Sequence, residues 1–361
     1  MMRDGRRLPS RQDPGCGAAS SGIWGKLVEE SLMIKFVLRR VLLFVPTLVA
    51  ISIVTFVLIQ LPPGDYLTSY LMELEQAGQE VSDELVASLK HRYRLDRPVY
   101  IQYFKWVSNI ILHGDFGRSM AWNRPVADLI RQRLSWTVVI SFATLILTWL
   151  LAFPIGIYSA THQYSLPDYL ATFIGFVGRG IPNFMIALVL MWLGYSWFGL
   201  DIGGLFSEEF AEAAWSWAKF VDLLKHMIVP VIVLGTASTA GLIRTLRANL
   251  LDELSKPYVI AARAKGLTEW RLIWKYPVRI ALIPFISSVG YVLPGLVSGA
   301  TIVSVVLGLP TTGPLLLRAL MSQDMYLAGS FFLLLSTLTV AGTLLSDILL
   351  GVIDPRIRLG E

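Results

Sequence analysis

The chain has 361 residues, of which 54% are hydrophobic and only 16% are charged, and its mean hydropathy is +0.59. A soluble domain of this size carries far fewer apolar side chains, so the composition excludes a soluble globular protein and indicates one that crosses a membrane several times. The net charge of +5 and the isoelectric point near 9.3 are explained by basic loops on one side of a membrane and give no support for nucleic-acid binding.

Residues 1–32 are rich in Gly, Ser and Arg and contain no apolar run of the kind found in a secretory signal. We expect a disordered tail here, or a start assigned too early, because Met33 directly precedes a basic flank and an apolar run. Cys16 is the only cysteine of the chain. One thiol cannot form an internal disulfide, and without a histidine cluster it indicates no metal site.

Six uncharged runs follow, and an α-helix needs about 20 apolar residues to cross the hydrocarbon core. The sequence therefore predicts an all-α polytopic membrane protein with six transmembrane helices, the first within residues 33–61. Gly308, Pro310, Gly313 and Pro314 interrupt the fifth run, so we expect it to hold one span and a re-entrant or surface piece. The runs are Val41–Ile59, Ser135–Ala160, Gly180–Leu200, Met227–Ile243, Ile280–Leu317 and Met325–Ser346.

Basic residues in short loops predict the orientation of the spans, because they concentrate on the cytoplasmic side. Residues 1–40 contain eight Lys and Arg against four acids, and residues 244–279 contain eight against three. Residues 200–226 contain two against five. We therefore expect a cytoplasmic N-terminus, an acidic loop outside and, from the even number of spans, a cytoplasmic tail at 354–361. The same parity places residues 62–134 outside, before a five-helix core at 135–353.

The loop at 249–281 is the most informative stretch of the core. Ser255 and Pro257 can begin a helix, Gly266 can end it in a left-handed turn with Leu267 against Ala262, and Thr268 can cap a second helix. Helical spacing puts Leu272, Ile273 and Tyr276 on one side of that second helix and Arg271, Lys275 and Arg279 on another. The pattern predicts a helix, a glycine turn and a helix at a membrane surface, presented to another protein.

The small residues Ala261, Ala262 and Gly266 in this loop resemble the cytoplasmic EAA loop of permease subunits of bacterial ABC importers. The run Ala-Arg-Ala-Lys-Gly-Leu, with a later Ile-Pro, is similar to the peptide and nickel branch of that family. Ile260 stands where the general loop pattern has Glu, and Ile283-Pro284 lies farther from Gly266 than in that pattern. Both departures are common in this branch.

Further motifs resemble the same branch, and they occur in its order from about residue 33 to residue 358. An ordered series of matches is more specific than any single one. The matching stretches are Ile34–Tyr66, Tyr93–Pro98, Tyr100–Trp106, His113–Ser119, Arg124–Val126 and Asp354–Arg356.

The resemblance implies a permease subunit in the bacterial inner membrane, with dipeptides or oligopeptides as solutes and oligosaccharides or nickel as alternatives. It implies a second homologous permease, two cytoplasmic ATPases that bind the coupling loop, an extracytoplasmic solute-binding protein and surrounding membrane lipid. ATP and Mg would be bound by the ATPases, since this chain has no phosphate-binding G-x-x-x-x-G-K-[ST] loop and is expected to bind no cofactor itself. The implied coupling residues are Ala261, Ala262, Arg263, Lys265, Gly266 and Leu267.

Two apolar stretches contain candidates for the translocation path. Arg179 lies deep in the third run, where a charge faces a cavity, a solute carboxylate or an acid of the sister subunit, or snorkels to the interface. The small residues of the fifth run permit either close helix packing or a solute path beside a kinking proline. The candidate residues are Arg179, Pro182, Asn183, Gly290, Pro294, Gly295 and Gly299.

An enzyme or a channel would be the rival functions. An intramembrane enzyme needs paired catalytic residues at membrane depth, and a channel needs a filter loop or a charged pore ring; the sequence shows neither pattern. We therefore expect a transport subunit with no catalytic residues, in which the partner ATPases hydrolyse ATP.

Overall fold

The computed structural model describes residues 23–60, 98–119, 121–199, 202–283, 285 and 301–353. Within these ranges the regular secondary structure is α-helical, apart from one antiparallel bridge between Arg118 and Pro125. The prediction of an all-α fold is confirmed. The expected tails at residues 1–22 and 354–361, and residues 62–97 of the expected extracytoplasmic region, lie outside the described residues.

Four helices are long and apolar enough to cross a membrane, and they correspond to the expected first, second, fourth and sixth spans. The apolar window of the first covers Val37–Val57. Its helix already begins at Ile23, so the expectation of a disordered tail is wrong for residues 23–32. The four helices are α1 (Ile23–Gln60), α5 (Val126–Thr161), α9 (Trp217–Leu254) and α16 (Met325–Ile353).

The expected third span is not one straight helix. It consists of the last residue of α6 (Leu166–Gly180) followed by the whole of α7 (Asn183–Phe198). The two helices are bent by 101° at the break between them. Pro182 lacks an N–H and disfavours helical geometry in the residue before it. Ile181 accordingly has an extended backbone, with φ −97° and ψ 127°. Counted as one span, the bent pair brings the spans of the described chain to five.

The expected fifth span falls partly on residues 284 and 286–300, which lie outside the described residues. Its second half is interrupted as the glycines and prolines predict. Helix α14 (Thr301–Val306) ends before Gly308, which has a φ of +65°, and α15 (Thr312–Met321) begins four residues later. This interruption separates two short helices that pack against each other.

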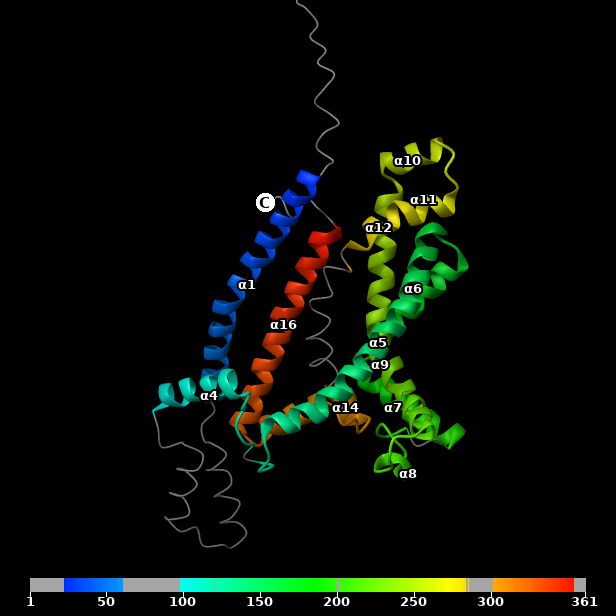
Figure 1. Ribbon diagram of the computed structural model, residues 1–361. Coiled ribbons are helices and arrows are strands. Elements are labelled where there is room, and N and C mark those ends of the chain that lie inside the picture. Colours follow the sequence, from blue (N-terminus) through cyan, green and yellow to red (C-terminus); the bar gives the residue numbers. More distant parts are fainter. Residues whose placement is uncertain are drawn as a thin grey trace, which may run out of the picture.

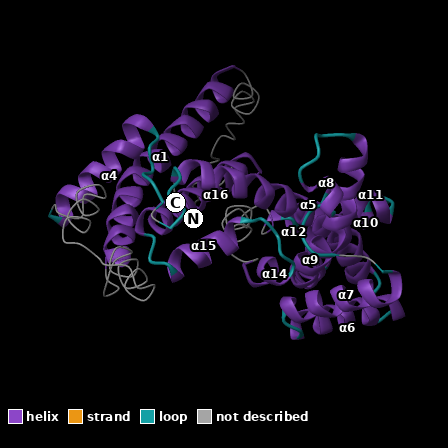
Figure 2. Ribbon diagram, turned by 90° about the horizontal axis from the view of Figure 1, so that it is seen from below, coloured by secondary structure: helices purple, strands orange, loops and turns teal. Residues whose placement is uncertain are grey.

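Direct helix packing and several apolar cores hold the long helices together. Helix α5 packs along α9, and α1 packs along α16 (Figure 1). The first core joins α5, α7, α9 and α14 through Ile140, Ala187, Val233 and Val303. The second joins the start of α5 to α15 and α16 through Val126, Ala319 and Phe331. Figure 2 shows that α6 and α7 lie on the far side of this arrangement from α1 and α4.

The two ends of the molecule carry different elements. Helices α10 (Pro257–Ala264) and α11 (Glu269–Lys275) lie at the end where α1 starts and α16 finishes (Figure 1). Helices α4 (Val99–His113) and α8 (Glu208–Ala211) lie at the opposite end. The N-terminal flank and the Gly266 loop thus share one side and the acidic loop lies on the other, as the distribution of basic residues predicts.

The run His113–Ser119, which contributes to the family resemblance, has a structural role at the α4 and α8 end. Asp324, which is fully buried before α16, accepts hydrogen bonds from the Ser119 hydroxyl at 2.5 Å and from the Ala121 N–H at 3.2 Å. Its other oxygen caps α16 by accepting from the Leu327 N–H at 3.1 Å. Buried polar groups of this kind require partners. This network therefore fixes the loop between α4 and α5 to the start of α16.

Candidate functional site

Helix α10 follows α9 directly, and Pro257 stands at its first position as predicted. At that position the missing N–H of proline costs no hydrogen bond, and its fixed φ suits a helix. The N-cap residue is Lys256. The expected capping by Ser255 is wrong, because Ser255 ends α9 and its hydroxyl donates to the Asp252 carbonyl at 2.9 Å.

The predicted glycine turn after α10 is confirmed. Gly266 has a φ of +80°, a region that favours glycine. Its N–H donates to the Arg263 carbonyl at 3.0 Å, and the Leu267 N–H donates to the Ala262 carbonyl at 3.4 Å. These two bonds define a Schellman ending. No atom of the described chain lies within 4 Å of the position that a Cβ would take, so backbone conformation, and not lack of space, calls for glycine at 266.

The second helix of the loop, α11, begins after Thr268 as predicted but is shorter than expected. Tyr276 has φ −117° and ψ −77°, away from the helical minimum, and α12 (Pro277–Ala281) starts at the next residue. Pro277 provides the physical reason, because a proline removes the N–H bond of a continuing helix and clashes with the preceding turn. Arg279 therefore belongs to a separate short helix.

The pair of helices around Gly266 encloses a small apolar core. Val259 and Ala262 of α10 and Leu272 of α11 are buried in it. The partly buried residues packed against them are Leu267, Ile273 and Tyr276. The predicted inner side of the second helix is thus confirmed, and the predicted polar side is exposed at Arg271, Lys275 and Arg279. This core holds α10 and α11 together as one unit.

An ion pair also closes the turn. The Arg263 guanidinium donates to both oxygens of the Glu269 carboxylate, from Nε at 2.5 Å and from Nη2 at 3.0 Å. These hydrogen bonds lower the pKa of Glu269 and raise the pKa of Arg263. Because both side chains are about half exposed, water screens the pair and its contribution to stability is small. This pair was not predicted, although Arg263 and Glu269 are opposite charges only six residues apart across a turn.

Helices α10 and α12 attach this unit to α9. The Tyr258 hydroxyl donates to the Glu253 carboxylate in the last turn of α9 at 2.5 Å. Burial and this carboxylate raise the pKa of Tyr258. Val278 and Ala281 of α12 pack in one core with Leu246 and Leu250 of α9. A displacement of α10 would therefore be transmitted to α9.

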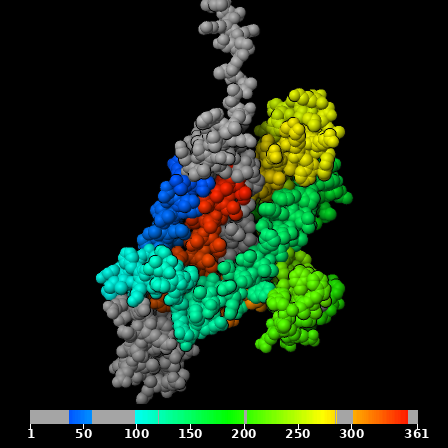
Figure 3. Space-filling view, viewed as in Figure 1, coloured from blue at the N-terminus to red at the C-terminus, as the bar shows by residue number. Residues whose placement is uncertain are grey.

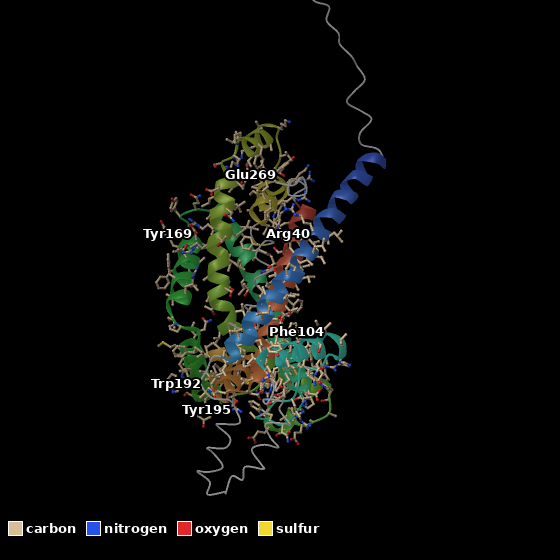
Figure 4. The ribbon with its side chains drawn as sticks, turned by 90° about the vertical axis from the view of Figure 1, so that its left-hand side faces the viewer. Arg40, Phe104, Tyr169, Trp192, Tyr195 and Glu269 are labelled. Carbon is tan, nitrogen blue, oxygen red and sulfur yellow. The ribbon has the colours of Figure 1, made fainter. Side chains whose placement is uncertain are left out.

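The outer surface of the unit is exposed and partly apolar. Trp270 is 71% exposed and Trp274 46% exposed, and Ile260 on α10 is 56% exposed. Figure 3 shows that α10 and α11 project from the end of the molecule, and Figure 4 shows Glu269 at its tip. Of the six residues implied as coupling residues, Ala262 and Leu267 face the small core. The other four are exposed: Ala261, Arg263, Lys265 and Gly266.

The candidates for a translocation path lie elsewhere. Arg179 is in the last turn of α6, and its Nη1 atom lies 3.7 Å from the position that a Cβ of Gly241 would take on α9. Gly241 is 13 residues before the end of α9 at Leu254, which is roughly 20 Å along a helix. Within the described ranges, the exposed Arg179 side chain makes no ion pair or hydrogen bond.

Pro182 and Asn183 lie at the break after α6, as the N-cap and the first residue of α7. The structure thus brings Arg179, Pro182 and Asn183 together at the bend. It does not bring them to the glycine turn, because α6 ends well away from α10 (Figure 1). The candidates Gly290, Pro294, Gly295 and Gly299, and Pro284 of the Ile-Pro pair, lie outside the described residues.

A buried ion pair between α6 and α9 was not predicted. Arg247 donates from Nε and Nη2 to the two oxygens of Asp168, both at 2.9 Å, and the Tyr164 N–H donates to the same carboxylate at 3.0 Å. Asp168 is only 2% exposed. Its 79-residue separation from Arg247 gives no local signal in the sequence. The pair ties the start of α6 to the part of α9 that carries α10 and α12.

Comparison with known proteins covers nearly the whole chain. Residues 152–359 match the family described as the inner membrane component of binding-protein-dependent transport systems. Residues 33–143 match the N-terminal part of the membrane components of such systems.

Several relatives align over most of their length. The oligopeptide transport system permease protein AppB of Bacillus subtilis is 34% identical over 331 residues, which cover 90% of this chain and 100% of the relative. The dipeptide transport system permease protein DppB of Escherichia coli is 30% identical over 343 residues, with 90% and 99% covered. The glutathione transport system permease protein GsiC of Salmonella typhimurium is 30% identical over 326 residues, with 90% and 99% covered.

Proposed function

The chain belongs to the family of inner membrane components of binding-protein-dependent transport systems, and we propose that it is a permease subunit of an ATP-driven importer of dipeptides or oligopeptides. The names of the relatives AppB, DppB and GsiC, which refer to oligopeptide, dipeptide and glutathione transport, support a peptide as the solute. In this proposal the chain forms the membrane path together with a second permease, and an extracytoplasmic binding protein delivers the solute.

The observation that carries the proposal is the projecting unit of α10 and α11. Its small core and the Schellman turn at Gly266 make it one body, and its outer surface exposes Ile260, Trp270 and Trp274. Exposed apolar side chains beside basic ones are typical of a surface that docks into a groove of a partner. The partner in this proposal is a cytoplasmic ATPase, one of two, which would bind ATP and Mg.

Because α10 and α12 are attached to α9, a force on this docking surface would move α9. Helix α9 has 38 residues, so it is roughly 57 Å long, whereas the hydrocarbon core is about 30 Å thick. Closure of the ATPases would displace α10, and α9 would pass the displacement to α5, along which it packs. Alternating access then follows from two arrangements of the same helices, biased by nucleotide.

Replacing Trp270 with serine should weaken the binding of the ATPase. A large exposed aromatic at the centre of a docking surface commonly contributes about 2 kcal/mol, equivalent to roughly 30-fold in affinity. The matched control is Tyr164→Ser, since Tyr164 is also 71% exposed and lies in the loop that ends α5 at the same end of the molecule. The measurement is the amount of ATPase that copurifies with the tagged chain from membranes.

Equal copurification for Trp270→Ser, Tyr164→Ser and the unchanged chain would exclude this surface as the docking site. The solute is tested separately, by uptake of labelled dipeptides in competition with oligosaccharides and with Ni²⁺. Competition by peptides alone supports the proposal. Uptake of Ni²⁺ or oligosaccharide without peptide uptake would refute the solute and leave the permease assignment in place.

We propose that Arg179 holds the carboxylate of the transported peptide at the bend between α6 and α7. Its unpaired guanidinium keeps its charge and is costly when it faces lipid. Arg179→Gln should lower uptake of peptides with a free C-terminus by about tenfold, because a hydrogen bond to a charged group contributes about 1.5–3 kcal/mol. Uptake of C-terminally amidated analogues should change little.

Competition between the paired analogues provides the measurement. An equal loss for both would rule out the carboxylate role and favour a brace against the second permease. Arg244→Gln is the control, because Arg244 lies on α9 one turn beyond Gly241 and is also exposed. In the proposed arrangement it should not discriminate between the two analogues.

A further inference from the structure

Helix α4 has two apolar surfaces, and the described chain covers only one of them. On the covered side, Tyr103 shares a hydrogen bond of 2.7 Å with Ser52 of α1, and its ring lies 5.4 Å from the ring of Phe56. Trp106, which is buried, lies 5.8 Å from the same Phe56 ring. These contacts fix α4 to the last turns of the apolar window of α1.

The contacts with α1 set the depth of α4. The apolar window Val37–Val57 has 21 residues, which is about 31 Å of helix and matches the roughly 30 Å of the hydrocarbon core. Ser52 and Phe56 lie in the last part of this window. Figure 1 shows α4 lying crosswise at the end of α1. Helix α4 therefore runs along the membrane surface, at the edge of the hydrocarbon core.

Six large apolar side chains of α4 are exposed, and three of them form a stripe along one side of the helix; the other three are Val99, Ile101 and Leu112. Tyr100, Phe104 and Ile111 are 64%, 67% and 74% exposed, and their spacing of four and seven residues places them on one side of the helix. Figure 4 shows Phe104 on the edge of α4 that is turned toward the spanning part of α1. At about 100° per residue, Lys105 and His113 lie away from this stripe, and both are exposed.

The stripe continues the apolar surface of α1. Near the end of its window, α1 exposes Val49, Ile53 and Val57 beside the contact with α4. In an inner membrane component this surface of a spanning helix faces lipid or another subunit. The stripe on α4 continues the same apolar surface at the end of α1, toward the membrane surface. A helix with one apolar side toward the bilayer and charged residues away from it has the geometry of an interfacial helix.

We infer that α4 is inserted in the membrane leaflet opposite the α10 and α11 end, with Tyr100, Phe104 and Ile111 among the acyl chains next to the headgroups. The partner of this surface is lipid. Through Tyr103 and Trp106 the helix holds α1 at a constant depth. It leads directly into the loop that Asp324 ties to α16, so it also anchors that loop.

The depth of α4 can be measured with a spin label on the intact importer complex, in which Cys16 is replaced by serine. Phe104→Cys carries the label in one sample, and Lys105→Cys is the matched control one residue away. The complexes are reconstituted in vesicles of phosphatidylcholine and phosphatidylglycerol. The background signal is measured on the Cys16→Ser complex, which has no cysteine introduced in α4, and is subtracted. Accessibility is then read with oxygen, which concentrates in lipid, and with a water-soluble nickel chelate.

The label at 104 should be several times more accessible to oxygen than to the nickel chelate, and the label at 105 should show the opposite preference. Equal exposure of both labels to the chelate would overturn the inference. Protection of the label at 104 from both reagents would also overturn it, since the stripe would then be covered by the second permease or by the binding protein. Retained peptide uptake in both labelled variants confirms that the complex is intact.

Discussion

Replacing Gly266 with valine should reduce ATP-driven uptake by at least about tenfold while the chain still inserts in the membrane. Gly266 has a φ of +80°, and a β-branched residue is strongly disfavoured there. Strain at such a residue costs on the order of 1–3 kcal/mol, which the chain relieves by moving the turn. Because the Leu267 and Gly266 N–H bonds would then be lost, α11 would shift from its position against α10.

The control for this variant is Gly266→Asn. Asparagine tolerates the left-handed region better than other residues with a Cβ, and the described chain leaves open space at this position. Uptake by the asparagine variant should therefore exceed that of the valine variant several times. The measurements are labelled-peptide uptake, copurification of the ATPase and the amount of chain in the membrane.

Normal uptake by the valine variant would remove the glycine turn from the coupling mechanism. Loss of uptake together with loss of the chain from the membrane would instead indicate a folding defect. The Asn variant separates a steric cause from a conformational one. A requirement for open space would affect both substitutions equally, whereas a requirement for positive φ would affect valine more.

The glycine turn was predictable because local rules determine it. Glycine after a helix takes the left-handed conformation, proline begins a helix at Pro257, and helical spacing places Leu272 inside. These rules act over a few residues and need no knowledge of the rest of the fold. They failed at Pro277, where the spacing of the basic residues suggested one helix and the proline in fact divides it.

The course of the longer helices was harder to predict, because apolar composition does not show where a helix bends. The third apolar run contains Pro182, yet a run of 21 uncharged residues indicates a span whether the helix is straight or bent by 101°. Similarly, Asp324 and Ser119 are 205 residues apart, and only the fold brings them together. The motif around Ser119 contributed to the family resemblance. In the structure Ser119 bonds to the buried carboxylate of Asp324, a residue that lies outside the motif.

The second large effect is expected at the buried ion pair below the coupling helices. Asp168→Ala leaves the Arg247 guanidinium, whose side chain is only 28% exposed, without its bidentate partner and leaves the Tyr164 N–H unpaired. Removing one member of a buried pair commonly costs about 3–5 kcal/mol. For a chain of this size, that corresponds to a fall in melting temperature of at least about 5 °C. The measurement is thermal unfolding of the purified importer complex.

Glu269→Gln is the comparison, because the Arg263 and Glu269 pair has the same bidentate geometry but is exposed, and exposed pairs contribute about 0–1 kcal/mol. If burial decides the energy, Asp168→Ala lowers the melting temperature far more than Glu269→Gln does. The double variant Asp168→Leu with Arg247→Leu should then regain part of the loss, because no buried charge remains unpaired. Equal effects of Asp168→Ala and Glu269→Gln would show that the pair between α6 and α9 does not stabilise the base of the coupling helices.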